Sequence, residues 1–315
     1  MSSIFLSAHV TITLFIALLV LIALTIAAFN TVQILKQYRP NAVSQMQYEL
    51  EKRSYLITTL IQLSLLINIF LLGFFIYTLN DLASLIPGAM CAAGVVGANP
   101  FGNPLLILKI IIILCSLLWL SLNHQDYYSK QHPYFKKKLY FFLFIYFLIL
   151  LNAIVEINFF ANLSTLTPVL CCSNIYAKTT TAMPFHLTTG VLVTLFYAMF
   201  FLLLFLLHLK KRVLITAFSI LFLYVSYLSI TYFFSTYIYE LPTHKCPYCI
   251  LGFDYYYVGY FIYGALLLAT FYALNTALFN FEDKSYKRAS YLYMVFVFLI
   301  SIKFIYYLLI NHTLL

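Results

Sequence analysis

Eight stretches of predominantly apolar residues constrain this fold more than any other feature, because a helix of about 20 such residues spans the hydrocarbon core of a bilayer. They cover residues 9–28, 55–79, 104–122, 139–157, 185–208, 214–238, 258–279 and 291–310. The chain is 64% hydrophobic and only 9% charged, whereas soluble domains average about 25% charged residues. The loops are short, so we predict one all-α transmembrane domain over residues 1–315, a polytopic bundle of eight helices.

Basic residues gather in every second loop between these spans. Fourteen of the 18 lysines and arginines follow spans one, three, five and seven, and the opposite loops contain only Lys178 and Lys245. Because cytoplasmic loops carry the excess of Lys and Arg, the basic loops are predicted to be cytoplasmic and both termini external, in a bacterial inner membrane. The net charge of +9 thus indicates membrane lipid as a partner and argues against nucleic acid.

The cysteines are concentrated on the predicted external side. Only Cys115 lies within a span, where it is expected to pack as a small buried apolar side chain. External compartments oxidise thiols, so cysteines there need a disulfide partner, a metal or a redox role. The five external residues are Cys91, Cys171, Cys172, Cys246 and Cys249, and in each loop a proline precedes the first cysteine by three or four positions.

The sharpest motif is Cys246-Pro-Tyr-Cys249. Two intervening residues let one thiol resolve a mixed disulfide formed by the other, which favours thiol exchange. The tetrapeptide is similar to the active site of glutaredoxins, although the strand-to-helix context of that fold is absent. Cys171 and Cys172 are adjacent, so each is expected to pair elsewhere rather than with the other.

The arrangement of external cysteines resembles that of the membrane thiol oxidases, the disulfide-bond-B and vitamin K epoxide reductase families. The resemblance implies electron transfer to a membrane quinone, with Cys246 and Cys249 as one redox pair. Two of Cys91, Cys171 and Cys172 would form the second pair. A periplasmic thiol protein is the expected partner. This is the function that the sequence favours.

A metal site is the competing interpretation, since soft thiolates select Cu⁺ or Zn²⁺. Histidine and methionine residues near the cysteine loops would complete the ligand set, and the cargo would be copper, zinc or haem, handled with a metal carrier or a respiratory complex. The full set of candidate ligands is Met90, Cys91, Cys171, Cys172, His186, His244, Cys246 and Cys249.

A third interpretation is a transporter or a non-enzymatic subunit whose cysteines form structural disulfides. No nucleotide-binding P-loop, metalloprotease motif or serine nucleophile elbow occurs in the sequence, so these three interpretations remain open.

Three charged residues fall within the predicted spans, where charge is costly and marks function. Lys109 and Glu156 lie near the external ends of neighbouring spans, which suggests an ion pair between them. Lys303 is deeper in the last span and is expected to face the bundle interior or a polar cavity, with a snorkelling lysine as the alternative. All three are candidates for binding a quinone or a haem carboxylate.

The loop over residues 80–103 is rich in Gly, Ala and Pro and holds almost no charge. It is too interrupted to continue a helix, yet residues 89–96 are apolar. A segment folded back onto the bundle and a flexible loop are both compatible with this pattern, since re-entrant backbone must be covered by protein or reach water.

Overall fold

The structure is a computed structural model that describes residues 3–37, 45–129, 132–169, 188–242, 244–279 and 283–313. All regular structure in these ranges is helical. Eight of the described helices are long and apolar enough to cross a membrane. The prediction of an all-α polytopic bundle is therefore confirmed, and these helices are those of an integral multi-pass membrane protein.

Most observed helices are longer than the predicted spans. The first, second and last extend by about eight to ten residues at their basic ends, and the seventh matches its predicted bounds. The sixth span is a composite in which a π-helical turn, Ile230–Phe234, joins two α-helices. The fifth begins at Thr189, because the hydroxyl oxygen of Thr188 accepts a hydrogen bond from the backbone N–H of Val191 (3.4 Å), an N-cap. The helices are α1 (Ala8–Gln37), α2 (Gln45–Leu82), α3 (Ala92–Val96), α4 (Gly102–Tyr128), α5 (Phe135–Ala161), α7 (Thr189–Leu209), α8 (Arg212–Ser229), α9 (Ser235–Tyr239), α10 (Val258–Phe279) and α11 (Asp283–Asn311), with 3₁₀ turns at Ser3–Leu6, Cys249–Leu251 and Phe253–Tyr255.

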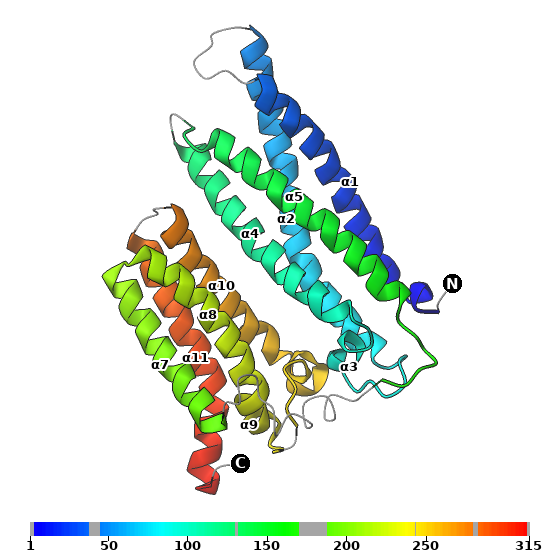
Figure 1. The fold of residues 1–315 in the computed structure, drawn as a ribbon, viewed down its shortest axis with the longest axis vertical. Coiled ribbons are helices and arrows are strands. Elements are labelled where there is room, and N and C mark those ends of the chain that lie inside the picture. The colour runs from blue at the N-terminus through cyan, green and yellow to red at the C-terminus, as the bar shows by residue number, and fades with distance from the viewer. Residues whose placement is uncertain are drawn as a thin grey trace. The chain divides into compact units, whose positions relative to one another are not determined.

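The chain divides into two compact units. Unit 1 consists of Met1–Thr78 and Asn99–Thr165, and unit 2 of Leu79–Ala98 and Leu166–Leu315. Unit 1 contains α1, most of α2, α4 and α5, whereas unit 2 contains α3 and α7 to α11 (Figure 1). The prediction of one transmembrane domain over residues 1–315 stays a prediction, because it concerns how the two units are joined.

Unit 1 is held by apolar packing along its helices. Trp119 of α4 and Phe142 of α5 are fully buried in a cluster with α1 and α2, and Cys115 packs against the same cluster, as expected of a small apolar side chain. Other large apolar side chains remain outside: Phe70 on α2 is 77% exposed and Phe144 on α5 is 52% exposed. Such outward-facing rings match a lipid environment.

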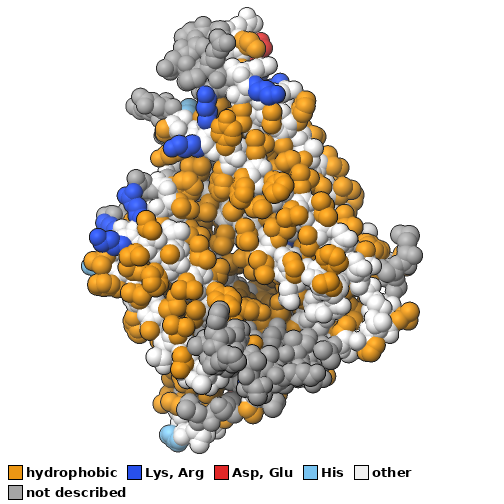
Figure 2. Space-filling model, in the orientation of Figure 1, with side chains coloured by type: hydrophobic (Ala, Val, Ile, Leu, Met, Phe, Trp, Pro, Cys, Tyr) orange, Lys and Arg blue, Asp and Glu red, His pale blue; other side chains and the backbone are white. Residues whose placement is uncertain are grey.

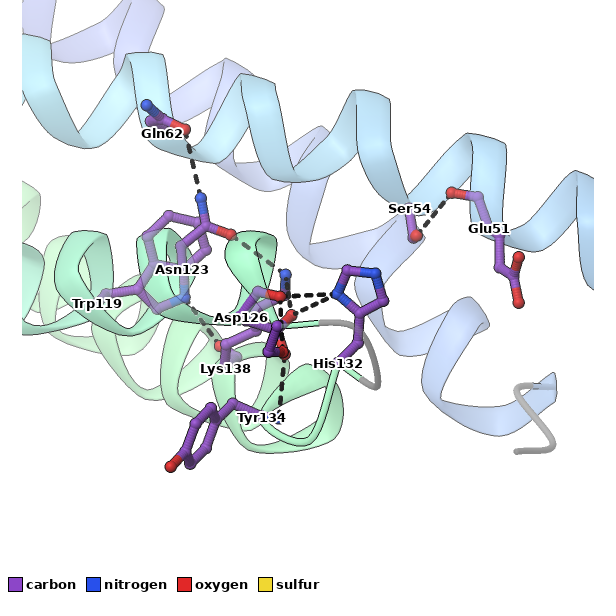
Figure 3. A network of polar contacts seen from close by, with 10 residues as sticks. Glu51, Ser54, Gln62, Trp119, Asn123, Asp126, His132, Tyr134 and Lys138 are labelled. Carbon is purple, nitrogen blue, oxygen red and sulfur yellow. Dashed lines mark hydrogen bonds and ion pairs between the residues drawn. The ribbon is translucent and has the colours of Figure 1, made fainter. Parts of the chain in front are cut away.

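A buried polar network closes the basic end of the α4–α5 hairpin (Figure 3). Asp126 is fully buried, and its carboxylate lies 2.7 Å from the ammonium of Lys138 and accepts a hydrogen bond from the backbone N–H of Tyr134 (3.0 Å). Lys138 also donates to Asn123 (3.2 Å), and Trp119 donates to the carbonyl of Lys138 (2.8 Å). A buried charge needs such partners, so the network fixes where the hairpin turns.

In unit 2, α10 packs against α8 and α11, while α7 packs against α8 and α11. The four helices close around aromatic rings. Phe222 of α8 lies 5.4 Å from Phe196 of α7 and 5.5 Å from Tyr293 of α11, between ring centroids. These are ordinary separations for stacked and edge-on pairs, and the rings form the core beneath the cysteine loops.

The residues 80–103 form a folded segment. The short helix α3 is buried along its whole length, in unit 2. Of the two alternatives left open by the sequence, the structure therefore supports the segment that folds back onto the protein.

Hydrophobic side chains cover most of the helix surface visible in Figure 2. Lysine and arginine side chains on this face gather near the helix ends where α1 meets α2, where α4 meets α5 and where α7 meets α8. Within each unit the charge thus lies at the ends of apolar helices, which is the pattern of a membrane-spanning segment.

Candidate metal centre

Three cysteines from distant parts of the sequence meet in unit 2. The Sγ atoms of Cys91, Cys246 and Cys249 all lie within 4.8 Å of one another, and Cys91 Sγ is 3.6 Å from Cys246 Sγ although 155 residues separate them. The Nε2 atom of His244 lies 3.3 Å from Cys249 Sγ. The arrangement brings three thiols together and places an imidazole beside one of them.

Cys91 is positioned by the start of α3. It precedes the first turn of that helix, and the side-chain oxygen of Asn80 accepts a hydrogen bond from the backbone N–H of Ala92 (3.2 Å). Three residues upstream, Gly88 has φ +82°, and a Cβ there would lie 2.3 Å from the carbonyl oxygen of Val169. Only glycine tolerates both conditions, so Gly88 is what lets this loop turn toward the site.

The Cys246–Cys249 turn is held by two tyrosine hydroxyls from the neighbouring helices. Tyr239, at the end of α9, donates to the carbonyl of Cys246 (2.6 Å) and accepts from the N–H of Ile250 (3.1 Å). Tyr263 of α10 donates to the carbonyl of Pro247 (2.8 Å). The two hydroxyls thereby supply hydrogen-bond partners to backbone groups of the turn that have none within a helix, as buried polar groups require.

A backbone N–H of the turn also donates a hydrogen bond to one of the sulfurs. The N–H of Tyr248 donates to Cys246 Sγ (3.4 Å), which stabilises negative charge on that atom. Behind the turn, Gly259 at the start of α10 approaches Ile250 so closely that a Cβ would lie 2.8 Å from the carbonyl oxygen of Ile250. The backbone and the side chain of Ile250 therefore both pack directly against Gly259 of α10.

Exposure differs across the cluster. Cys246 is fully buried and Cys91 is 8% exposed, whereas Cys249 and His244 are half-buried. Tyr255 stands at the rim, and the pKa of its hydroxyl is raised by burial and then by the charges of Cys249, Asp254 and Cys246.

Comparison of the chain with protein-family models, with curated proteins and with solved structures finds no match.

Several predicted ligands are not placed in this cluster. Cys171, Cys172 and His186 lie outside the described residues. Met90, adjacent to Cys91, is 76% exposed, so its side chain points to the surface and not into the buried thiol group. The structure unites Cys91, His244, Cys246 and Cys249 from the predicted set.

The predicted pairing of Lys109 with Glu156 is present in unit 1. Lys109 Nζ lies 2.9 Å from Glu156 Oε2, with side-chain exposures of 9% and 2%. Asn152 donates to the same oxygen (3.1 Å), and the ammonium sits 4.4 Å from the ring centroid of Phe75. The second carboxylate oxygen, Oε1, has no hydrogen-bond partner among the described residues. The quinone or haem role given to this pair stays a prediction.

The side chain of Lys303 does not lie in the packed interior of unit 2, so that part of the expectation is wrong. Its side chain is exposed on α11, and its Nζ atom lies 6.0 Å from the ring centroid of Tyr306. A lysine can cover apolar surface with its methylene stem while its ammonium interacts with an aromatic face. The snorkelling alternative is the one that this geometry supports, and its cofactor-binding role has no support from its surroundings.

Sequence reasoning missed the residues that shape the site without contacting sulfur directly, chiefly Tyr239, Tyr263 and Gly259. The chain has 28 tyrosines, so no sequence signal separates these two from the interfacial ones. Gly259, at the start of an apolar span, is the one of these positions where the sequence offers a clue to close packing.

Replacing Tyr239 by phenylalanine is expected to loosen the turn. The change leaves the buried carbonyl of Cys246 and the N–H of Ile250 without their partner, which costs about 1–3 kcal/mol for each unsatisfied group. Thermal unfolding of the purified protein should show a lower Tm. Tyr232→Phe removes a hydroxyl from the same composite span and serves as the control; an equal loss in both variants would contradict the role given to Tyr239.

Proposed function

We propose that this integral membrane protein binds one soft metal ion, Zn²⁺ or Cu⁺, through Cys91, His244, Cys246 and Cys249. The observation that carries the proposal is the convergence of three sulfurs within 4.8 Å of one another. The second nearby donor type is the His244 imidazole, which lies 3.3 Å from Cys249 Sγ and would complete a Cys₃His set on metal binding.

The spacing of the donor atoms fits a tetrahedral ion. Four ligands at Zn–S distances of about 2.3 Å place neighbouring sulfurs about 3.8 Å apart, close to the 3.6 Å between Cys91 and Cys246. A disulfide requires about 2.05 Å, and the described cysteines are all unbonded to one another. Thiolates and imidazole together are ligands for Zn²⁺ and for copper.

The exposure of the ligands suggests how the ion is exchanged. Cys91 and Cys246 are buried, while Cys249 and His244 are reached from outside. A carrier protein that approaches from the open side would replace these two ligands first. We infer that the site receives or delivers its metal at this side, with a metal carrier or a respiratory complex as the partner.

The site is assigned to the external side of the membrane. Arg212 begins the composite span of 28 residues that ends at Tyr239, a length of about 42 Å, and Cys246 follows soon after. The basic α7–α8 turn and the cysteine turn therefore belong to opposite ends of this span. With basic loops on the cytoplasmic side, the metal centre faces the periplasm of an inner membrane.

Thiol exchange is the second candidate, favoured by the position of Cys91 next to Cys246 and by the accessibility of Cys249. In this function, an external protein dithiol would be oxidised to a disulfide while a Cys246–Cys249 disulfide is reduced to two thiols. A second disulfide that includes Cys91 would then reoxidise Cys246 and Cys249 by thiol–disulfide exchange, and the two electrons and two protons would pass to a quinone, which becomes a quinol. The burial of Cys246 argues against direct attack there by a large partner.

One experiment separates the two functions. The protein is purified without chelators, its metal content is measured, and each cysteine is probed with an impermeant maleimide read residue by residue by mass spectrometry, in the purified protein and in intact cells. We expect about one Zn²⁺ or Cu⁺ per chain and protection of Cys249 that a chelator removes. Labelling in intact cells after chelation would also report the external side.

The matched control is Cys115→Ser, which removes a thiol in unit 1 and should keep the metal content of the natural chain. If labelling of Cys246 and Cys249 instead requires a reductant and no metal is bound, the metal proposal is overturned and thiol exchange takes its place. Unprotected thiols without metal would contradict both functions.

A further inference from the structure

A groove in unit 2 follows the contact between α10 and α11, two helices that run side by side (Figure 1). Its volume is about 510 Å³, within the range of small-molecule sites. The groove is open and lies between two membrane-spanning helices. It is far along α10 from the cysteine turn that precedes this helix. The lining residues are Leu268, Tyr272, Lys287, Arg288, Tyr291 and Leu292.

One end of the groove is strongly basic. Lys287 and Arg288 are both exposed and lie in the first two turns of α11, where the helix dipole adds positive potential instead of offsetting it. No carboxylate of the described residues forms an ion pair with either side chain. The guanidinium of Arg288 lies 5.9 Å from the ring centroid of Tyr272, across the groove, which fixes one cation over the opening.

The other end of the groove is apolar and lies deeper in the span. α10 ends at Phe279 and α11 begins at Asp283, so both helices meet at the basic end. Leu268 is one turn further from that end than Tyr272, and Leu292 is one turn further than Arg288. Leu268 is 42% exposed. The groove therefore offers cations at the membrane surface and leucines toward the hydrocarbon.

We propose that this groove binds an anionic phospholipid, with the phosphate between Lys287 and Arg288 and an acyl chain along Leu268 and Leu292. A phosphate accepts several charge-assisted hydrogen bonds from Arg and Lys, and the hydroxyls of Tyr272 and Tyr291 stand at the interfacial level where tyrosine is enriched. Soluble anions would use only the basic half of the groove. An anion with an apolar body uses both halves.

The test compares two lipids on the purified, delipidated protein. Phosphatidylglycerol and phosphatidylcholine with identical acyl chains are titrated separately, and bound lipid is counted by native mass spectrometry. The natural chain is expected to retain one phosphatidylglycerol in preference to phosphatidylcholine. The variant Lys287→Gln/Arg288→Gln should bind phosphatidylglycerol about 25-fold more weakly, the effect of two cations that each contribute about 1 kcal/mol near an anionic headgroup.

The matched control is Lys136→Gln/Lys137→Gln, which removes two exposed charges from the first turn of α5 and should leave the retained lipid unchanged. Leu268→Asn keeps both cations and should weaken phosphatidylglycerol binding several-fold if the acyl chain lies in the groove. Equal binding of the two lipids, an equal loss in the control, or complete displacement of lipid by inorganic phosphate would overturn the proposal.

Discussion

Replacing Glu156 by leucine while Lys109 remains is expected to lower the free energy of unfolding by about 3–5 kcal/mol, because it leaves a buried ammonium without its counter-ion. The carboxylate is 2% exposed and lies 2.9 Å from Lys109 Nζ. It also holds the amide of Asn152. Unfolding of the purified protein in mixed micelles, driven by increasing SDS, measures the change.

The double variant Lys109→Leu/Glu156→Leu separates charge compensation from mere packing. Removing both charges takes away the uncompensated ammonium, and buried ion pairs replaced by apolar side chains are often as stable as the original pair. We expect most of the lost stability to return. Glu49→Leu, at an exposed carboxylate on α2, should stay within about 0.5 kcal/mol of the natural chain. A double variant as unstable as Glu156→Leu would mean that the two charges do not act as a pair.

The same ion pair illustrates what the sequence can predict. Apolar segments of this length form helices in lipid, because every backbone polar group must be satisfied within the segment. Helices that follow one another in sequence pack together when their loops are short, so the sequence predicts that Lys109 and Glu156 lie on neighbouring helices. Lys303 shows the limit of that reasoning. In a helix that is apolar on all sides, no periodicity distinguishes the face toward the protein from the face toward lipid.

The sequence also does not predict the division into two units, for a related reason. Helices in lipid associate through shape and a few polar contacts, and in this chain those contacts involve ordinary residues. Thr13 of α1 and Thr78 of α2, for example, share a hydrogen bond of 3.2 Å inside unit 1. Nothing in the spacing of two threonines 65 residues apart predicts such a contact.

The candidate site was half predictable. The cysteine positions in the sequence predict that thiols form the site and which loops carry them. The sequence also predicts His244 as a ligand, because it precedes Cys246 by two residues. The sequence did not select Cys91 as the partner of Cys246, since its loop is rich in glycine and alanine and gave no fixed structure. The buried helix α3 and the positive φ of Gly88 (+82°) provide that fixed structure.

Replacing single ligands of the proposed metal centre is expected to produce a graded loss of Zn²⁺ affinity. Cys246→Ser removes the fully buried sulfur, which lies 3.6 Å from Cys91 Sγ and accepts the N–H of Tyr248. Because loss of an outer-shell partner alone weakens metal binding about 10–100-fold, loss of this ligand should exceed 100-fold. Competition with a chromophoric chelator measures the affinity of each purified variant.

His244→Ala should weaken binding less than Cys246→Ser, since water can replace an imidazole on the half-exposed side of the site, whereas no water replaces a thiolate buried among protein atoms. Cys115→Ser, whose sulfur packs in unit 1, should bind with the affinity of the natural chain. This order follows from burial, and it would be reversed if the ion were held mainly at the surface by His244 and Cys249. Equal affinities in all four proteins would remove Cys246 and His244 from the coordination of the metal and contradict the proposed site.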